Sequence, residues 1–167
     1  LALLPAEVDH FDLDSFHDRP IQTELVELML LPQNDAHFTS CLLIHGMGGT
    51  GKSMAAVAVL QEKAIRAHFN NIYWLGVGAD AVDLKLQQLQ SMLYTQMSGK
   101  SVKADDVLAK GKQEWLDMLV EAMTMERSLV VLDDPWTPEQ VRFLNPIESS
   151  HTEAHRLLVT TRIRGLV

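Results

Sequence analysis

CLLIHGMGGTGKS, residues 41–53, predicts a strand, a glycine-rich loop and the start of a helix. The loop fits the pattern G-x-x-x-x-G-K-[ST], with Gly46, Gly51, Lys52 and Ser53 at the required places. That pattern describes a phosphate-binding loop, or P-loop, and average residue usage puts a chance match in a chain of this length on the order of one in a hundred or less.

The residue types of the loop suit a phosphate chain, because an anion needs converging N–H donors and a backbone without side chains that hold it away. The unpaired N–H groups and the dipole at the following helix start favour negative charge. We expect Lys52 to reach the β- and γ-phosphates and the Ser53 hydroxyl to ligate Mg²⁺. A glycine turn that only joins a strand to a helix would leave both side chains unexplained. The predicted phosphate-contacting residues are Gly46, Met47, Gly48, Gly49, Thr50, Gly51, Lys52, Ser53 and Met54.

Composition indicates one ordinary folded domain. The chain has 167 residues, of which 47% are hydrophobic and 22% charged, enough to bury a core. Residues 1–40 carry eight acids and one base, and so hold most of the net charge of −8. This uneven charge argues against a nucleic-acid surface and favours a solvated acidic lead-in over residues 1–18, followed by the domain at 19–167.

Cysteine usage and hydropathy favour the cytosol. Cys41 is the single cysteine, so no internal disulfide forms, and its place in an apolar run predicts a buried structural thiol. No stretch reaches the roughly 20 apolar residues that span a bilayer. The opening LALLPAE is too short for a signal peptide. We therefore expect a cytoplasmic protein without a membrane span, and the absence of an initial methionine suggests a piece of a longer chain.

Apolar runs alternate with helical patterns along the chain, which predicts a parallel sheet wound by right-handed crossovers. The lead-in is expected to be extended. Strands are predicted at 41–45, 72–77, 128–133 and 157–161. Helices are predicted after a cap at Asp18, from the P-loop to about His68, after a cap at Asp80 with Leu84, Leu89, Leu93 and Met97 on its inner face, over about 106–124, and after the capping box Thr137-Pro138-Glu139-Gln140.

Two further stretches carry candidate chemistry. LVVLDD places Asp133 and Asp134 at the end of an apolar strand, where ligands bind in open α/β sheets. We expect Asp133 to hold Mg²⁺ and Asp134 to orient or deprotonate the attacking water. LLVTTR places Arg162 after another strand, where a guanidinium can contact a γ-phosphate. Pro135 is expected to restrict the backbone of Asp134 toward extended conformations.

Taken together, the chain resembles the NB-ARC family of signal-transducing NTPases. GMGGTGKS, LVVLDDPW and LLVTTR resemble the family's Walker A, Walker B and sensor stretches in order and spacing, and NIYWLGVG resembles the strand between them. The resemblance covers roughly residues 14–165. It implies an α/β P-loop NTPase fold of three layers, α/β/α, with strand order 5-1-4-3-2 and the fifth strand missing from this chain. Phe16, His17 and Arg19 are similar to the family segment that contacts adenine.

The resemblance implies a switch domain that binds ADP or ATP with Mg²⁺, neighbouring effector and repeat domains, and an oligomer that depends on the nucleotide. Slow hydrolysis of the ATP β–γ bond would reset the switch, with Lys52, Asp134 and Arg162 as the catalytic residues. Later family elements, a proline that touches adenine and a histidine that senses the diphosphate, have no counterpart in this sequence, so the chain is interpreted as the first part of the module. Three alternatives stay open: a cycling AAA+-type ATPase, a P-loop interaction module without catalysis, and a small-molecule kinase.

Overall fold

A computed structural model describes residues 1–9, 20–123, 125–148 and 155–167. Its four strands are β1 (Cys41–His45), β2 (Asn71–Gly76), β3 (Ser128–Asp133) and β4 (Arg156–Thr161). They are all parallel and lie in the order β1-β4-β3-β2. Each expected strand is present within a residue of its predicted bounds, and the order matches the expected 1-4-3-2 part of the sheet.

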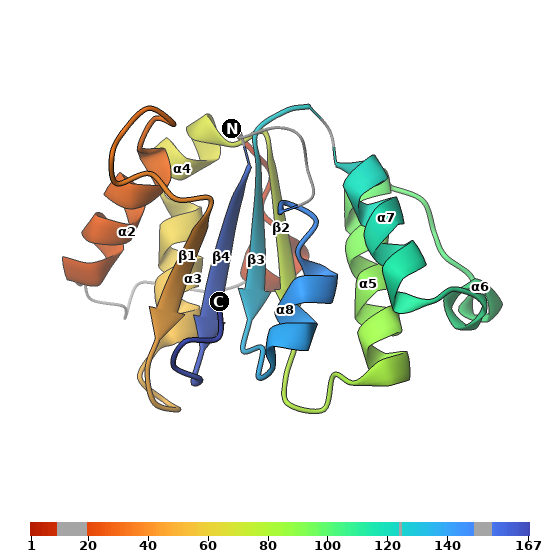
Figure 1. The fold of residues 1–167 in the computed structure, drawn as a ribbon. Helices are drawn as coiled ribbons and strands as arrows, with labels where there is room; N and C mark the ends of the chain where they lie inside the picture. Colours follow the sequence, from red (N-terminus) through yellow and green to blue (C-terminus); the bar gives the residue numbers. More distant parts are fainter. Residues whose placement is uncertain (10–19, 124, 149–154) are drawn as a thin grey trace.

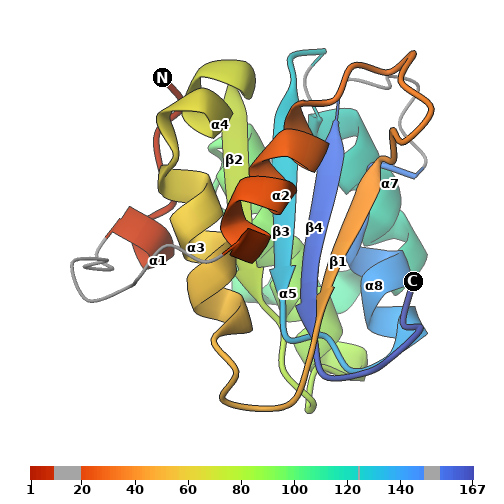
Figure 2. The same ribbon diagram turned by 90° about the vertical axis from the view of Figure 1, so that its left-hand side faces the viewer.

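Helices cover both faces of this sheet, as Figures 1 and 2 show. One face carries α2, α3 and α4, and the other carries α5, α7 and α8. The three-layer α/β/α fold expected from the sequence is therefore confirmed. The helices are α1 (Ala6–Asp9), α2 (Pro20–Leu30), α3 (Lys52–Gln61), α4 (Lys63–His68), α5 (Asp83–Ser98), α6 (Ala104–Ala109), α7 (Lys112–Ala122) and α8 (Pro138–Leu144).

The central strands β3 and β4 form the middle of the core, because both are almost completely buried. Their side chains alternate between the two faces, so each strand contributes to two hydrophobic clusters. Leu129, Val131 and Leu158 lie on the α3 side, and Val130 and Val159 lie on the α5 side. Because the strands are parallel, the carboxyl ends of all four lie at one edge of the sheet, at the bottom of Figure 1.

Two helices that the sequence predicts as continuous are each divided in the structure. Glu62 interrupts the first with an extended backbone (φ −59°, ψ 128°), and its carboxylate accepts a hydrogen bond from Gln22 of α2. The change of direction accompanies complete burial of Ile65 in α4. Lys110 and Gly111 are extended and divide the second into α6 and α7. Gly111 was the available sequence signal, since glycine weakens a helix interior.

The predicted start of the next helix was also wrong. Asp80 does not cap α5, because α5 begins at Asp83 after Val82, and Asp80 forms an ion pair with Lys85 instead. Leu84, in the first turn of α5, is 44% exposed and does not belong to the inner face, whereas Leu89, Leu93 and Met97 are buried as expected. At α8 the prediction was right: Thr137 and Gln140 form the capping box, with Pro138 at the first helical position.

The N-terminal lead-in is not extended throughout. Its short helix α1 buries Val8 completely, and the Ala2 N–H donates to the Arg66 carbonyl of α4. Apolar residues in this acidic segment thus pack against the domain, an outcome that charge alone did not predict. The cap expected at Asp18 lies outside the described residues.

Strand β1 lies at the outer edge of the sheet and pairs only with β4 among the strands of the described ranges. Leu42 and Ile44 are buried, while Cys41 and Leu43 are half-buried and His45 is exposed. The sequence predicted a buried thiol at Cys41, but this residue is only half-buried because β1 lies at the edge of the sheet. Of the helices in the described ranges, none is long and apolar enough to cross a membrane.

Candidate functional site

The P-loop connects the end of β1 to the first residue of α3. Gly49 and Gly51 both have positive φ, 76° and 84°, a backbone region that favours glycine. Two donors converge on the Met47 carbonyl: the Thr50 hydroxyl at 2.8 Å and the Lys52 ammonium at 2.9 Å. Lys52 and Ser53 open α3, so the loop delivers both functional side chains at a helix N-terminus.

A hydrogen bond joins the P-loop helix to the end of β3. The Ser53 hydroxyl donates to Asp133 Oδ1 at 2.7 Å, and the Thr160 hydroxyl of β4 donates to the same oxygen. Asp133 and Thr160 are opposite each other in the strand register. The structure therefore brings together the two predicted metal ligands, Ser53 and Asp133, which are 80 residues apart in the chain.

Asp134 lies beside Asp133 but contacts different residues. Arg162 Nε donates to Asp134 Oδ1 at 3.2 Å, and the Trp136 indole N–H donates to Oδ2, also at 3.2 Å. The Arg162 guanidinium also lies 5.4 Å from the centroid of the Trp136 ring. Both carboxylate oxygens of Asp134 thus accept hydrogen bonds, and Arg162 lies beside Asp134 at the carboxyl edge of the sheet.

The backbone of Asp134 is left-handed, with φ 57°, and not extended as Pro135 led us to expect. Tertiary hydrogen bonds account for this, because the Asp134 N–H donates to the Thr160 carbonyl at 2.9 Å. The Thr161 hydroxyl donates to the Pro135 carbonyl at 2.7 Å. Aspartate tolerates the left-handed region better than most residues do. Hydrogen bonds to β4 therefore determine the conformation of this turn and override the local restriction before proline.

These groups line a cavity of about 430 Å³. Its lining combines loop, strand-end and sensor residues: Gly49, Gly51, Lys52, Ser53, Met54, Asp133, Asp134, Thr160 and Arg162. Gly46, Met47, Gly48 and Thr50 belong to the same loop outside that lining. Phe16, His17 and Arg19, the predicted adenine contacts, lie outside the described residues.

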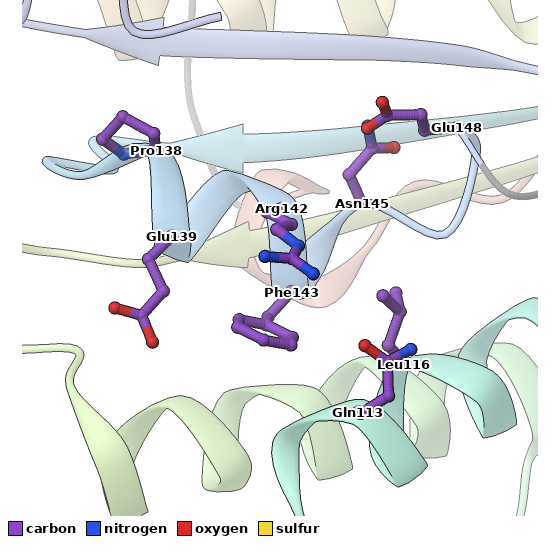
Figure 3. Close-up of a pocket in the computed structure, with 8 residues that line it drawn as sticks. All are labelled: Gln113, Leu116, Pro138, Glu139, Arg142, Phe143, Asn145 and Glu148. Atoms are coloured by element: carbon purple, nitrogen blue, oxygen red, sulfur yellow. The ribbon is translucent and has the colours of Figure 1, made fainter.

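A larger cavity of about 770 Å³ lies elsewhere, between α7 and α8 (Figure 3). No P-loop, Asp133 or Arg162 atom lines it. Two of its charged side chains have partners in the protein: Glu139 pairs with Lys112, and Arg142 lies 5.1 Å from the Phe143 ring centroid. Because the residues predicted to bind phosphate do not converge there, the smaller cavity is the candidate site.

The donor set of the smaller cavity fits Mg²⁺ held together with phosphates. Ser53 offers a hydroxyl and Asp133 a carboxylate, and Ser53 Oγ lies 2.7 Å from Asp133 Oδ1. Across the described ranges, no cluster of three or more histidine, cysteine, aspartate or glutamate side chains is present. Mg²⁺ commonly binds through one or two protein oxygens, water and substrate phosphates, so this sparse set is what a P-loop magnesium site requires.

Sequence reasoning missed three residues that organise the site. Thr160 has no assigned role in the sequence analysis, because its position opposite Asp133 depends on the register of β3 with β4. Trp136 was quoted within a motif but given no role. Gln140 was predicted as a cap, yet its buried amide also donates to the Gly78 and Ala81 carbonyls at 3.1 and 3.0 Å. It thereby joins the loop after β2 to the loop after β3.

A parallel sheet with a P-loop after its first strand, an aspartate after β3 and an arginine after β4 defines the P-loop NTPase class of fold and site. Comparison with known families agrees: the NB-ARC domain matches residues 21–167. The chain belongs to the NB-ARC domain family and is a nucleotide-binding domain.

The chain is also similar to plant proteins named for disease resistance. It is 28% identical over 142 residues to "Disease resistance protein RGA2" of Solanum bulbocastanum, a match that covers 84% of this chain and 14% of that protein. With "Disease resistance protein RPM1" of Arabidopsis thaliana, it is 26% identical over 70% of this chain and 12% of the relative. With "Disease resistance protein RPH8A", also of Arabidopsis thaliana, it is 26% identical over 87% of this chain and 15% of the relative. The chain thus spans about one seventh of the length of these relatives or less.

Proposed function

We propose that this chain is the adenine-nucleotide-binding part of a signalling switch, in which ADP or ATP bound with Mg²⁺ sets the state of a larger receptor. The observation that carries this proposal is the 2.7 Å hydrogen bond between Ser53 and Asp133, beside Lys52 and Arg162. This geometry supports a site in which a phosphate loop, a carboxylate proposed to bind the metal and a fixed positive charge surround one cavity. The family and the resistance proteins that match it support the signalling role.

Each side chain has a distinct part in this proposal. Mg²⁺, when bound, neutralises charge on the β- and γ-phosphates. Ser53 and Asp133 hold the metal, Lys52 binds the phosphates, and Arg162 distinguishes a triphosphate from a diphosphate through a charge-assisted contact. Asp134 orients the attacking water. Phe16, His17 and Arg19 are proposed to contact adenine.

Hydrolysis of the ATP β–γ bond is proposed to be slow. Both oxygens of Asp134 already accept hydrogen bonds, from Arg162 and Trp136, so a water molecule competes with two donors for this carboxylate. A resetting switch also benefits from a long-lived bound state. Phosphate release near 10 s⁻¹, ordinary for enzymes, would instead favour a cycling AAA+-type motor. Asp134 is shorter than the glutamate usual in such motors, and this further supports the switch.

The proposal includes surroundings beyond the chain. The relatives are several times longer than this chain, so we propose neighbouring effector and repeat domains, a cytoplasmic location and assembly that depends on the bound nucleotide. The nucleotide that co-purifies with the parent protein tests the switch directly. Retained ADP supports it, and the absence of any retained nucleotide would argue for rapid cycling or for a module that does not bind nucleotide.

Substitution of the P-loop lysine gives the sharpest test of binding. Lys52→Ala is expected to weaken the binding of Mg²⁺ and a fluorescent ADP analogue at least tenfold, because the ammonium is a charged phosphate donor, and a tenfold loss corresponds to about 1.4 kcal/mol. The fold is expected to be preserved, since the Lys52 ammonium donates to the Met47 carbonyl within the exposed loop. Lys63→Ala, at the start of α4 and away from the cavity, serves as the matched control. Equal affinity in wild type and Lys52→Ala would contradict the phosphate-binding assignment.

A further inference from the structure

Trp136 connects two residues of the site without lining the cavity itself. Its indole N–H contacts Asp134 Oδ2, and its ring lies 5.4 Å from the Arg162 guanidinium. Because Arg162 also contacts Asp134 Oδ1, each of the three side chains contacts the other two. We call Asp134 and Trp136 the Arg162 clamp.

Hydrogen bonds to the rest of the domain hold the backbone of both clamp residues. The Asp134 N–H donates to the Thr160 carbonyl of β4, and the Trp136 N–H donates to the Gln140 side chain at 2.6 Å. Gln140 is 1% exposed and also bonds the loop after β2. Both clamp residues are therefore held through their backbone N–H groups by β4 and by the buried Gln140, whereas Arg162 is a long side chain, 47% exposed. Of the three, Arg162 is the residue that is free to move.

The other end of Arg162 reaches the P-loop. A Cβ atom built on Gly48 would lie 3.1 Å from Arg162 Nη1, so the guanidinium rests directly on this glycine. The same side chain thus lies between the acidic clamp and the loop that receives phosphates. An arginine in this position has two competing anionic partners, the Asp134 carboxylate and a terminal phosphate.

We propose that Trp136 is a positioning residue that fixes Asp134 as the competitor of the γ-phosphate for Arg162, and that the clamp thereby lowers the affinity for triphosphate relative to diphosphate. This inference rests on the proposed nucleotide-binding function. ADP has no γ-phosphate to compete, so its affinity is independent of the clamp. Trp136 is then a determinant of the preference between ADP and ATP without touching either one.

The size of the effect follows from the exposure of the pair. Exposed ion pairs contribute little, and this one is about half exposed on the arginine side, so releasing Arg162 is expected to raise triphosphate affinity about two- to fivefold. Removing only the indole donor leaves the Asp134 charge in place and is expected to give the smaller change, about twofold.

The test measures binding of Mg²⁺ with ADP and with the non-hydrolysable analogue AMP-PNP by calorimetry, so that it does not depend on turnover. Asp134→Asn is expected to raise the AMP-PNP affinity two- to fivefold with ADP affinity within twofold of wild type. Trp136→Phe keeps an aromatic face but removes the N–H donor. It is expected to raise the ratio of AMP-PNP affinity to ADP affinity about twofold. Glu114→Gln breaks a comparable exposed pair with Lys110, away from the site, and is the matched control.

A double variant separates positioning from general loss of structure. If Trp136 acts through Asp134, adding Trp136→Phe to Asp134→Asn changes the affinity ratio no further. A purely structural role predicts instead that Trp136→Phe weakens both nucleotides alike and lowers the melting temperature. An unchanged ratio in both single variants overturns the clamp while leaving the proposed function intact. Failure of the wild type to bind ADP overturns the proposed function and the clamp with it.

Fluorescence gives an independent readout. The wild-type emission minus that of Trp136→Phe isolates Trp136, because Trp74 and Trp115 are both buried in the core and common to the two proteins. Departure of the guanidinium from the ring is expected to change this difference signal more with AMP-PNP than with ADP. Equal responses to the two nucleotides would mean that Arg162 does not leave the clamp.

Discussion

Asp133 and Asp134 are neighbours in the chain but form hydrogen bonds with different residues. Asp133 accepts from the Ser53 and Thr160 hydroxyls, whereas Asp134 accepts from Arg162 and Trp136. The positive φ of Asp134 turns its side chain away from the strand direction that Asp133 follows. Paired acids at a strand end thus divide into a candidate metal ligand and a group that engages the sensor arginine.

Cys41 supports a prediction at the same scale. Burial, and then the nearby Glu148 carboxylate, raise the pKa of the Cys41 thiol to about 11. At pH 9 about one thiol in a hundred is then ionised, against about three in four for an ordinary cysteine. Because the thiolate is the nucleophile, we expect reaction with a disulfide reagent at pH 9 to be about two orders of magnitude slower than in urea-unfolded protein. Similar rates in both states would mean that the Cys41 thiol is more accessible than its half-buried position implies.

At the scale of elements, α8 and its capping box determine how the loops at the carboxyl edge are joined. Gln140 Oε1 accepts from the Trp136 and Thr137 N–H groups, and its amide donates to two carbonyls of the loop after β2. One buried side chain therefore positions the turn that carries the Arg162 clamp. The short helix contributes to the site through this network and not through its own length.

Gln140→Glu tests that network. A carboxylate at this position cannot donate to the Gly78 and Ala81 carbonyls and places a buried negative charge against them. We expect a loss of about 2 to 4 kcal/mol in the free energy of unfolding, measured by urea denaturation. Gln88→Glu makes the same chemical change at an exposed position of α5 and is expected to change stability by less than about 0.5 kcal/mol. Equal effects of the two substitutions would contradict the role of Gln140.

At the scale of the whole molecule, the site joins segments from both halves of the chain. The P-loop follows β1, the acidic pair follows β3 and Arg162 follows β4, so a ligand that contacts all three links most of the sheet. Such a ligand binds the folded state and not the unfolded chain, and it must therefore stabilise the fold by mass action.

Thermal unfolding with Mg²⁺ and ADP measures this linkage. At a nucleotide concentration of about one hundred times Kd, the expected stabilisation is about 2.7 kcal/mol. For a domain of this size, that corresponds to a rise in melting temperature of roughly 5 to 10 °C. Lys52→Ala at the same concentration is expected to show a much smaller rise, and EDTA is expected to reduce the rise in the wild type. A melting temperature independent of nucleotide would contradict binding at this site.

The outer strand β1 gives a second prediction for the whole molecule. It pairs with β4 alone among the strands of the described ranges, and its half-buried Cys41 and Leu43 leave apolar surface at an edge without lysine or proline. We expect residues 1–167 to self-associate at high concentration and Leu43→Lys to reduce this, as measured by size-exclusion chromatography with light scattering. Leu3→Lys, at a position that is 85% exposed and outside the sheet, is the control and is expected to have no effect. A concentration-independent monomer in wild type would show that the edge is already protected.

The sequence by itself determined the class of fold and the principal residues of the site. Glycine spacing, strands of continuous apolar residues and the acids and arginine after them follow local rules of backbone conformation and burial, which can be recognised from one chain. The capping box of α8 is equally local, and it formed as predicted.

Only the tertiary structure decided how these residues meet. The breaks at Glu62 and Gly111, the left-handed backbone of Asp134 and the roles of Thr160 and Trp136 depend on partners far away in the chain, such as Gln22 for Glu62. Local propensity differs by less than about 1 kcal/mol between most residues, so long-range hydrogen bonds and packing can override it. For this reason the sequence predicted which residues would gather at this edge of the sheet, while the contacts of Asp133 with Thr160 and the candidate Arg162 clamp depend on the register of β3 with β4.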